Sequence, residues 1–326
     1  MTVDLLITGA GGWLGAALCD VLGSLAQFSA PSSLCVVLGP DDNECLEKRW
    51  HELGVVLRRG NLLDAEFAAT LPQARHVIHA AAVIHPERPS GFEVNEKLTE
   101  VALQLTSHDG VFTHVSSAAA LGVGVLESFP TGSAAAAPVG GYAESKLLCE
   151  QRVVGFTHST GIRAVVLRPF WFYGANPPPR QLRFNSMCRS GRFPLPSERI
   201  RRSVSNVHEI AFATLRSAQL ASRSVPAFFV ADPQPYSYQE LVAARRRDRR
   251  ARGIRVPLLV FALFAVCDRI LQRCGVYIAP IHVLGEFSVS IAALNDHVSQ
   301  HRVLLGLPHE VELAAGVLAE LAPSGR

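Results

Sequence analysis

The chain has 326 residues, 48% of them hydrophobic and 18% charged, and a formal net charge of +3. This composition excludes a disordered protein. So small a net charge also argues against a nucleic-acid partner, whose binding depends on a clustered basic face. The length favours one large α/β domain with a smaller one appended.

Short apolar runs alternate with helix-like stretches through the first half of the chain. Strands are predicted over residues 3–8, 34–38, 55–57, 76–79, 111–116 and 164–167. Helices are predicted between them over residues 13–25, 44–53, 64–71, 92–106 and 142–157. Because parallel strands need helices on both faces of their sheet, the alternation predicts a Rossmann-type, doubly wound α/β fold.

The pattern changes after Arg168-Pro169, where prolines at 177–179 and short basic segments follow. We predict a Rossmann domain over 1–174 and a small, mainly substrate-binding domain over 175–326. Within this second part, the segment 203–232 is expected to return to the main sheet as a helix at 207–220 and a strand at 227–231.

The chain carries no pattern for a membrane span, a disulfide framework or a metal site. Its longest apolar run, 256–267, has twelve residues, whereas a spanning helix needs about 20. No signal peptide is expected before the first apolar run, which begins at Val3. Seven scattered cysteines without a CxxC pair are typical of a reducing cytosol, so we expect a cytoplasmic protein. His297 and His301 have no third ligand nearby, and no metal is expected.

A glycine-punctuated turn, Gly9-x-x-Gly12-x-x-Gly15, follows the first predicted strand. The first glycine permits the tight turn, the second lets the backbone approach a pyrophosphate, and the third lets helix and strand pack closely. Backbone amides at the helix start, at Trp13 and Leu14, then face the phosphates. The turn predicts a dinucleotide cofactor, NAD or NADP.

The end of the second strand bears on the choice between these cofactors. A carboxylate there accepts hydrogen bonds from the ribose hydroxyls, whereas an arginine favours the 2′-phosphate of NADP. Gly39-Pro40-Asp41-Asp42 brings two acids and no neighbouring arginine, which favours NAD with Asp41 as its ligand. The alternative is that the acids only cap the next helix.

Tyr142 and Lys146 stand four residues apart, so they project from one face of a helix. A free tyrosine has a pKa of about 10, and a neighbouring ammonium stabilises the phenolate and lowers that value. Ser117, at the end of the fifth strand, would orient a substrate oxygen toward the phenol. We predict these three residues as the catalytic groups of hydride transfer at a secondary alcohol or ketone, with Lys146 also holding the nicotinamide ribose.

Taken together, these motifs resemble the extended short-chain dehydrogenase/reductases, a family of NAD-dependent sugar epimerases, dehydratases and 3β-hydroxysteroid dehydrogenases. The resemblance covers nearly the whole chain. Besides TGAGGWLG at 8–15 it rests on GNLLD at 60–64, HAAA at 79–82, FEVNEKLT at 92–99, VSSAAALG at 115–122, RPFWFYG at 168–174 and LLGLP at 304–308. The further cofactor contacts that it implies are Asn61, Leu62, Ala80, Ala81, Ala82, Pro169 and Phe170.

The chain departs from the family at three places that bear on the substrate. Asn61 replaces the usual Asp near the adenine, and Trp171 stands where many sugar-nucleotide epimerases carry Asn. Ala118 and Ala119 replace the acidic pair of the 4,6-dehydratases, so a dehydratase is rejected. Asn95, Trp171 and Arg202 are the expected substrate residues, and the first of them also matches a structural Asn of the family.

Two substrate classes remain open. GRFPLP at 191–196 followed by RRSV at 201–204 resembles bacterial UDP-4-keto-sugar reductases, with Arg202 placed against a nucleotide diphosphate. The alternative for these arginines is a solvated face. The basic segment at 245–250 before the apolar run 256–267 instead suits peripheral membrane contact and a steroid or lipid substrate. The alternative there is an arginine-faced helix followed by a buried one.

The resemblance also implies a homodimer, paired through the predicted helices at 92–106 and 142–157. A non-catalytic NAD(P)-binding regulator is the remaining alternative. Such proteins usually lose the tyrosine or the lysine, and this chain keeps both Tyr142 and Lys146.

Overall fold

The structure is a computed structural model that describes residues 2–29, 33–127, 129–246, 248, 250–313 and 315–317. Within these residues, a seven-stranded sheet has the order β12-β7-β5-β4-β1-β2-β3, and every neighbouring pair is parallel. Its strands are β1 (Thr2–Thr8), β2 (Leu34–Leu38), β3 (Val56–Arg59), β4 (Gln73–His79), β5 (Thr106–Val115), β7 (Arg163–Pro169) and β12 (Ala227–Val230). The predicted Rossmann-type fold is confirmed.

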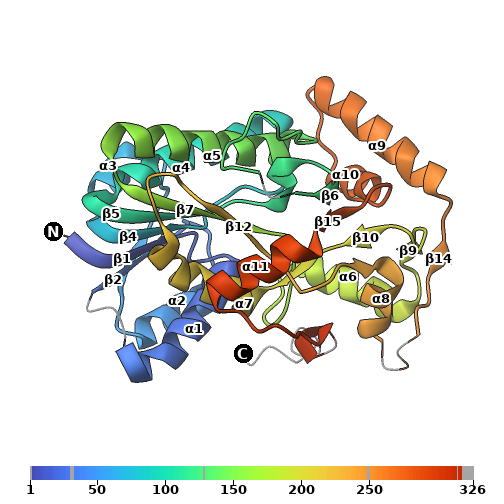
Figure 1. The fold of residues 1–326 in the computed structure, drawn as a ribbon, viewed down its shortest axis with the longest axis horizontal. Coiled ribbons are helices and arrows are strands. Elements are labelled where there is room, and N and C mark those ends of the chain that lie inside the picture. The colour runs from blue at the N-terminus through green and yellow to red at the C-terminus, as the bar shows by residue number, and fades with distance from the viewer. Residues whose placement is uncertain are drawn as a thin grey trace.

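Helices cover both faces of this sheet (Figure 1). One face carries α3 (Ala65–Ala69), α4 (Val94–Gln104) and α5 (Gly141–Thr160); the other carries α1 (Trp13–Ser29), α2 (Glu44–Glu52) and α7 (Val207–Arg216). Ile7 packs with the apolar side chains of one face and Leu6 with those of the other, since successive side chains of a strand point to opposite sides. Both faces of the sheet are therefore buried, as the continuous apolar runs predicted.

Some predicted elements differ from the observed ones. The helix expected over 64–71 is only α3, because the Asp64 side chain accepts hydrogen bonds from the amides of Glu66 and Phe67 and caps the helix from outside. The helix expected over 92–106 divides into a 3₁₀ turn, η1 (Pro89–Glu93), and α4. Beyond α4 the chain enters β5, whose first residue, Thr106, pairs with Ala74 of β4.

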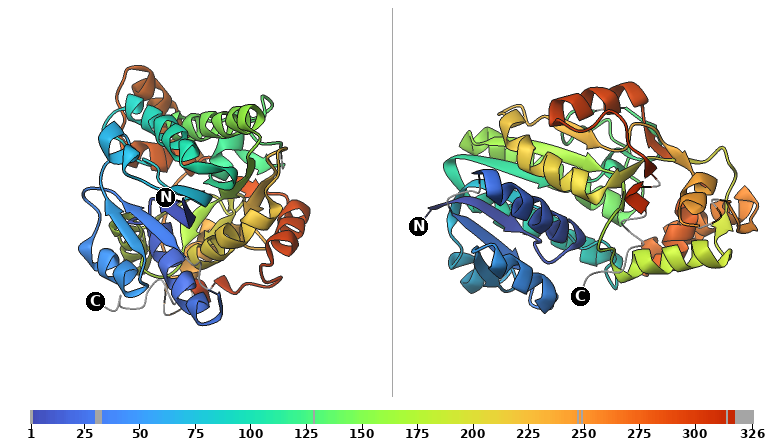
Figure 2. Two further views of the ribbon diagram at one scale, coloured as in Figure 1. Left: turned by 90° about the vertical axis from the view of Figure 1, so that its left-hand side faces the viewer. Right: turned by 90° about the horizontal axis from the view of Figure 1, so that it is seen from below.

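The remaining elements gather at the end of the sheet opposite the N-terminus (Figures 1 and 2). Within the described residues they include a four-stranded sheet, β13-β10-β15-β6, and the pairs β11-β8 and β14-β9. The strands are β6 (Gly124–Leu126), β8 (Trp171–Tyr173), β9 (Pro194–Leu195), β10 (Arg201–Arg202), β11 (Val204–Asn206), β13 (Tyr236–Ser237), β14 (Ile254–Arg255) and β15 (Ile291–Ala293). The helices are α6 (Pro179–Ser190), α8 (Tyr238–Ala244), α9 (Leu258–Arg273), α10 (Ala279–Glu286) and α11 (Asn295–Leu305), with the short turn η2 (Ala118–Leu121). The turn η3 (Ser217–Leu220) lies instead on the large sheet, against α7, β5 and β7.

The chain crosses between these two parts more than once. β6 joins the small sheet, whereas α7 packs on α1 and β12 pairs with β7 in the large one. Between the two parts of the molecule lie the carboxyl ends of the large sheet's strands, where doubly wound folds bind ligands. The boundary at 174 stays a prediction. Within the described residues, no helix is long and apolar enough to cross a bilayer.

Candidate active site

The three glycines of the turn after β1 have three different surroundings. Gly9 has a φ of +76°, and a Cβ there would lie 2.5 Å from the amide nitrogen of Ala81. A Cβ on Gly15 would lie 2.2 Å from the carbonyl oxygen of Ala10, so only glycine lets α1 approach the strand so closely. A Cβ on Gly12 would meet only the Gly9 oxygen, at 3.5 Å, which leaves open space beside the backbone. This cradle fits a dinucleotide pyrophosphate.

Most side chains around this cradle make contacts within the protein. Trp13 Nε1 donates a hydrogen bond to the carbonyl oxygen of Ala175 at 2.7 Å, and Leu14 is buried in the core. A cofactor role for these two residues would therefore fall to their backbone amides. Ala80, Ala81 and Ala82 follow β4, half-buried, and the close approach of Gly9 to Ala81 places them beside the turn.

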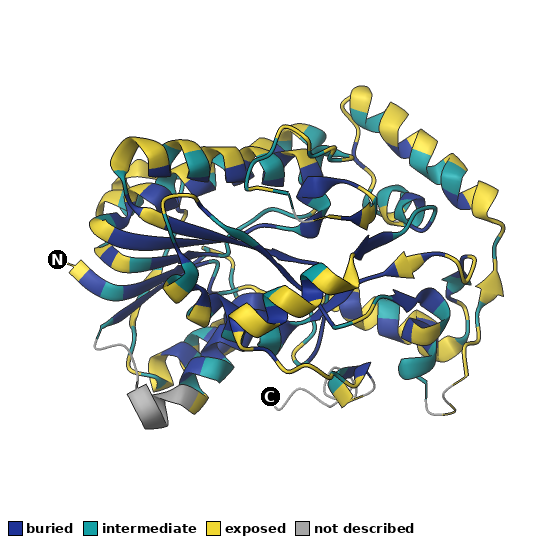
Figure 3. Cartoon of the chain, viewed as in Figure 1, coloured by how far each residue is buried: buried dark blue, intermediate teal, exposed yellow. Residues whose placement is uncertain are grey.

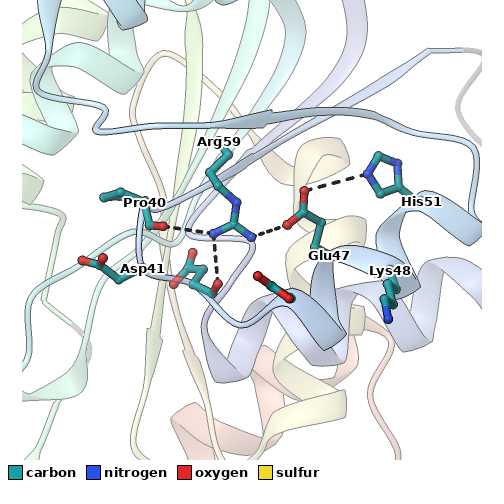
Figure 4. A pocket seen from close by; sticks show the side chains of 8 residues that line it. Pro40, Asp41, Glu47, Lys48, His51 and Arg59 are labelled. Carbon is teal, nitrogen blue, oxygen red and sulfur yellow. Dashed lines mark hydrogen bonds and ion pairs between the residues drawn. The ribbon is translucent and has the colours of Figure 1, made fainter.

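The turn after β2 carries Asp42, rather than Asp41, to the glycine turn. Asp42 Oδ2 accepts a hydrogen bond from the Gly39 amide at 2.6 Å, and a Cβ on Gly11 would lie 1.8 Å from the same oxygen. Asp41 is exposed and, together with Asp42, lines a pocket of about 510 Å³ at the outer edge of the sheet (Figure 4). Of the two acids that the sequence offered, Asp42 is the one beside the predicted cofactor path.

An arginine that sequence proximity did not reveal lies beneath this turn. Arg59, the last residue of β3, donates hydrogen bonds to the carbonyl oxygens of Gly39, Pro40 and Asp42 at 3.2, 3.2 and 2.9 Å. Figure 4 shows the bond to Pro40. Its other terminal nitrogen forms an ion pair with Glu47 of α2. The parallel pairing of β2 with β3 brings it there. The Arg59 guanidinium is therefore paired with the Glu47 carboxylate, and its hydrogen bonds hold the turn in place.

The residues predicted near the adenine have ordinary structural partners. Asn61 is exposed, and its side-chain oxygen accepts a hydrogen bond from the Leu63 amide at 3.0 Å. Leu62 is buried in the core on the α4–α5 side of the sheet. Contact of either with an adenine stays a prediction.

The three predicted catalytic residues meet where β5 ends and α5 begins. β5 ends at Val115, one residue before the predicted end at 116, and Ser117 caps η2 by accepting a hydrogen bond from the Ala119 amide at 3.2 Å. The Ser117 hydroxyl lies near enough to Tyr142 to lower the pKa of its phenol. Lys146 is buried and donates from Nζ to the Val115 carbonyl oxygen at 2.8 Å. The trio therefore occupies one corner of the sheet's carboxyl edge.

The electrostatics of the phenol differ from the expectation. Burial raises the pKa of Tyr142 to about 12, and the charge that opposes this rise most strongly is that of Arg180, followed by the hydrogen bond from Ser117. Burial also lowers the pKa of Lys146, against the effects of Cys149 and Glu150. The cation expected to act on the phenol was Lys146. The structure adds Arg180, at the start of α6, from a segment in which the sequence carried no signal.

Two of the expected substrate residues are already bonded inside the protein. Asn95 is buried; its amide oxygen accepts from the Val83 amide at 2.7 Å, and its amide nitrogen donates to Val83 O and Ser145 Oγ, both at 3.0 Å. Arg202 is buried as well; its Nε donates to the Tyr238 hydroxyl at 2.8 Å, and Nη2 lies 3.3 Å from a Glu286 carboxylate oxygen. Both residues brace the walls of the site.

The third expected substrate residue is Trp171, which follows Pro169 and Phe170 in the chain. Trp171 is half-buried against Phe184 and Tyr238, with ring centroids 4.8 and 6.3 Å apart. Pro169 ends β7, and the Phe170 amide donates to Ser205 Oγ at 2.8 Å, which joins β7 to β11. Placement of Pro169 and Phe170 beside a nicotinamide stays a prediction.

Aromatic rings connect Tyr142 to the segment after α9. The Phe92 ring lies 6.2 Å from that of Tyr142 and packs edge-on against Tyr277 at 5.4 Å. The Tyr277 hydroxyl lies 2.8 Å from His85 Nδ1. One residue before Tyr142, the Gly141 amide donates to Gln272 of α9 at 3.2 Å. The α9–α10 pair is therefore attached directly to the start of the catalytic helix.

Among the described residues, no group of three His, Cys, Asp or Glu side chains is placed to hold a metal ion. The groups capable of chemistry at this site are thus a phenol, an ammonium, a hydroxyl and a guanidinium. Beside the glycine cradle, this set suits proton transfer at a carbinol whose hydride a dinucleotide accepts.

Comparison with known proteins agrees with this geometry. The protein y4nL of Sinorhizobium fredii (strain NBRC 101917 / NGR234) is 28% identical over 337 residues, which cover 96% of this chain and 92% of y4nL. The crystal structure of gox2253 matches with a TM-score of 0.73 at 18% identity, covering 98% of this chain and 96% of that one. UDP-glucuronic acid 4-epimerase from Bacillus cereus, in complex with UDP-glucuronic acid and NAD, matches with a TM-score of 0.68 at 17% identity, covering 98% of both chains.

The two solved structures share the fold with this chain at low identity. A family model, that of the NAD dependent epimerase/dehydratase family, matches residues 5–194. This range holds the glycine turn, Ser117, Tyr142 and Lys146, and it spans more than half of the sequence. The chain therefore belongs to the NAD dependent epimerase/dehydratase family.

Proposed function

We propose that this protein is an NAD-linked oxidoreductase that acts on a nucleotide sugar, as a 4-keto reductase or an epimerase. The observation that carries the proposal is the meeting of Ser117, Tyr142 and Lys146 at the carboxyl edge of the sheet, in the same fold as the glycine cradle. The similarity to an epimerase whose structure holds UDP-glucuronic acid and NAD supports the nucleotide-sugar class.

In the proposed mechanism, Ser117 donates a hydrogen bond to the substrate oxygen and orients it toward Tyr142. The phenol of Tyr142 exchanges a proton with that oxygen while the carbinol carbon loses or gains hydride. The cofactor, when bound, would accept the hydride as NAD+ or donate it as NADH, and its oxidised form would add a positive charge near the phenol. Lys146 holds the nicotinamide ribose, and its charge together with that of Arg180 favours the phenolate form of Tyr142. Burial of the phenol makes such cations necessary at neutral pH.

The choice of NAD over NADP rests on the turn after β2. Asp42 would accept hydrogen bonds from the adenosine ribose, and its carboxylate would repel a 2′-phosphate. Arg59 lies close by, but Glu47 balances its charge. The Asp42 carboxylate therefore favours a ribose with free hydroxyls, in a pocket that Lys48 also lines (Figure 4).

A steroid or lipid dehydrogenase is the second candidate, and one observation favours it. The helix α9 exposes large apolar side chains next to the site, a surface that a water-soluble nucleotide sugar does not need. The third candidate, a regulator without catalysis, is disfavoured because the whole catalytic trio is present and assembled.

We further propose that the protein is a cytoplasmic homodimer. Each chain would have two domains, divided near residue 174. The pairing surface would be α4 and α5, which pack together and are linked by Arg152 with Glu96 and Glu100. Leu148 of α5 is exposed on the same pair of helices and would be covered in the dimer.

The test is absorbance of the reduced cofactor with purified protein, using NADH and NADPH against UDP-4-keto sugars and 3-ketosteroids. Net oxidation with one panel identifies the substrate class, and Tyr142→Phe should abolish it while leaving NADH binding nearly intact. An epimerase would instead interconvert UDP sugars without net change of absorbance, which product chromatography detects. Full activity in Tyr142→Phe would show that the mechanism is wrong.

A further inference from the structure

The outward side of α9 carries a continuous stripe of large apolar side chains. Leu259, Leu263, Val266 and Ile270 are 71%, 56%, 44% and 55% exposed. At 3.6 residues per turn these four fall within an arc of about 60°. Phe261 and Asp268, on the opposite side, are buried. Figures 1 and 3 show α9 at the periphery of the molecule with its outer side exposed. Such a stripe belongs to a surface that is covered in the working protein.

The inner side of the same helix is packed and bonded, so α9 is held in this orientation. It lies against α10 so closely that a Cβ on Gly285 would be 2.8 Å from Ala265 Cα. The buried Asp268 carboxylate accepts a hydrogen bond from Gln272 at 2.8 Å and lies 2.9 Å from His282. The alternative of a buried helix at 256–267 is therefore wrong: only one side of α9 faces the protein.

The exposed charges between residues 250 and 276 are all positive, and one of them, Arg252, pairs with Asp248. Residues 250–276 contain five arginines and a single acid, Asp268, which is buried on the inner side. Arg255, Arg269 and Arg273 are exposed. Within the described part of α9, the outer side thus presents apolar groups and positive charge without a carboxylate.

The basic segment that the sequence pointed to contributes less than expected. Arg245 is buried and donates to Asn185 at 2.8 Å, and Arg246 pairs with Asp248. Arg247 and Arg249 lie outside the described residues. The cations beside the stripe are therefore those within and just before α9, rather than those at 245–246.

We propose that the outer side of α9, defined as Leu259, Leu263, Val266, Ile270 and Arg273, binds the surface of an anionic membrane. The helix would lie in the plane of the interface, with the apolar stripe among the acyl chains and the arginines at the phosphates. A second copy of the chain fits less well. Two such faces would oppose arginines without any acid, and a 16-residue helix is small for the roughly 800 Å² per partner of a stable interface.

Membrane binding would place the catalytic corner near the bilayer. Gln272 of α9 accepts a hydrogen bond from Gly141, and Tyr277 packs through Phe92 toward Tyr142. A carbonyl or carbinol carried on a lipid could then reach the site from the interface. The membrane proposal stands apart from the catalytic one, because vesicle binding is measured without substrate and Tyr142→Phe should leave it unchanged.

The experiment is flotation of the full-length protein with vesicles of phosphatidylcholine, alone or with about 30% phosphatidylglycerol. Binding is expected with the anionic vesicles, and it should weaken when salt rises from about 0.1 to about 0.5 M. Leu263→Glu should lower the partition coefficient at least about tenfold, since it replaces a membrane-buried side chain. Leu304→Glu, on α11, is the matched control at a residue 50% exposed and should bind like the unmodified protein.

A second measurement separates folding from docking. Cys267 of α9 and Cys45 of α2 are both exposed, so each can carry a polarity-sensitive fluorophore in a chain whose other exposed cysteines are Ser. Emission should shift to the blue on anionic vesicles only for the label at Cys267. No vesicle binding by the unmodified protein overturns the proposal. So does a Leu263→Glu variant that still binds vesicles but changes from dimer to monomer in light scattering.

Discussion

Glu150 and Arg168 form a bidentate ion pair that is wholly buried behind the three residues proposed to be catalytic. Arg168 Nε and Nη2 donate to the two Glu150 oxygens at 2.9 and 2.6 Å. The same carboxylate accepts from Ser116 Oγ at 2.7 Å and from the Gly132 amide at 2.9 Å. Glu150 follows Lys146 by one helical turn, and Ser116 precedes Ser117. The pair therefore ties β7, the serine loop and the catalytic helix together.

Removing one member of this pair should strongly destabilise the protein. Glu150→Gln leaves the Arg168 charge buried without its partner, so we expect the free energy of unfolding to fall by about 3 kcal/mol or more. Urea unfolding followed by circular dichroism measures it. Arg152→Gln, which breaks an exposed pair on the same helix, should cost under about 1 kcal/mol. An equal loss of unfolding free energy in the two variants would contradict the proposed role of the Glu150–Arg168 pair.

Asp42, not Asp41, should control affinity for the cofactor. Asp42→Asn removes the charged acceptor beside Gly11 and should raise the Kd for NADH by about tenfold, because hydrogen bonds to charged groups are worth about 1.5–3 kcal/mol. The Kd for NADPH should change less, since a repulsive charge is lost at the same time. Asp41→Asn is the control on the neighbouring residue. Fluorescence titration gives all four values, and a larger effect at Asp41 would reverse the assignment.

Arg180 should set the pH at which Tyr142 works. Its charge lowers the pKa of the buried phenol, so Arg180→Gln should move the acidic limb of the kcat/KM profile for alcohol oxidation, in which the phenolate is the base, to higher pH. Activity at neutral pH should fall by about tenfold for each unit of that move. Arg180→Lys should restore part of it. Arg183→Gln, an exposed change on the same helix, is expected to leave the profile in place.

Buried neutral histidines should make the protein sensitive to acid. Burial lowers the pKa of His79 to about 3 and that of His114 well below 6.5, and neither nitrogen of His114 has a hydrogen-bond partner. Because the unfolded chain binds these protons first, the histidines stabilise the fold above pH 6.5. This stability is lost as the pH falls toward the folded-state values. Each histidine should contribute about 1.4 kcal/mol per pH unit to the decline.

Urea unfolding between pH 7 and about 5 measures this slope. His114→Leu should reduce it by the share of one histidine, whereas His108→Leu, at an exposed residue, should not change it. A slope that is the same in His114→Leu as in the unmodified chain would show that His114 is not responsible.

The sequence by itself determined the sheet, the glycine turn and the placement of Tyr142 and Lys146 one turn apart on one helix. These features depend on local regularities: a period of 2 or 3.6 residues, a turn that needs glycine, and two side chains one helical turn apart. The first half of the fold was predictable because each of its units repeats this local pattern. The position of Ser117 could also be predicted, because the end of a parallel strand has a known place in such a sheet.

Only the tertiary structure decided which side chains meet across the chain. In the folded chain Asp42, rather than Asp41, lies beside the glycine turn, and Arg59 lies beneath the turn that carries both acids. Arg180, from a segment that follows three prolines, lies near Tyr142. Arg202 bonds to Tyr238 and Glu286 inside the protein, and one side of α9 is exposed. An apolar run reads the same whether its side chains end in a core or on a surface. Burial and charge pairing depend on what packs against a segment, which distant parts of the chain supply.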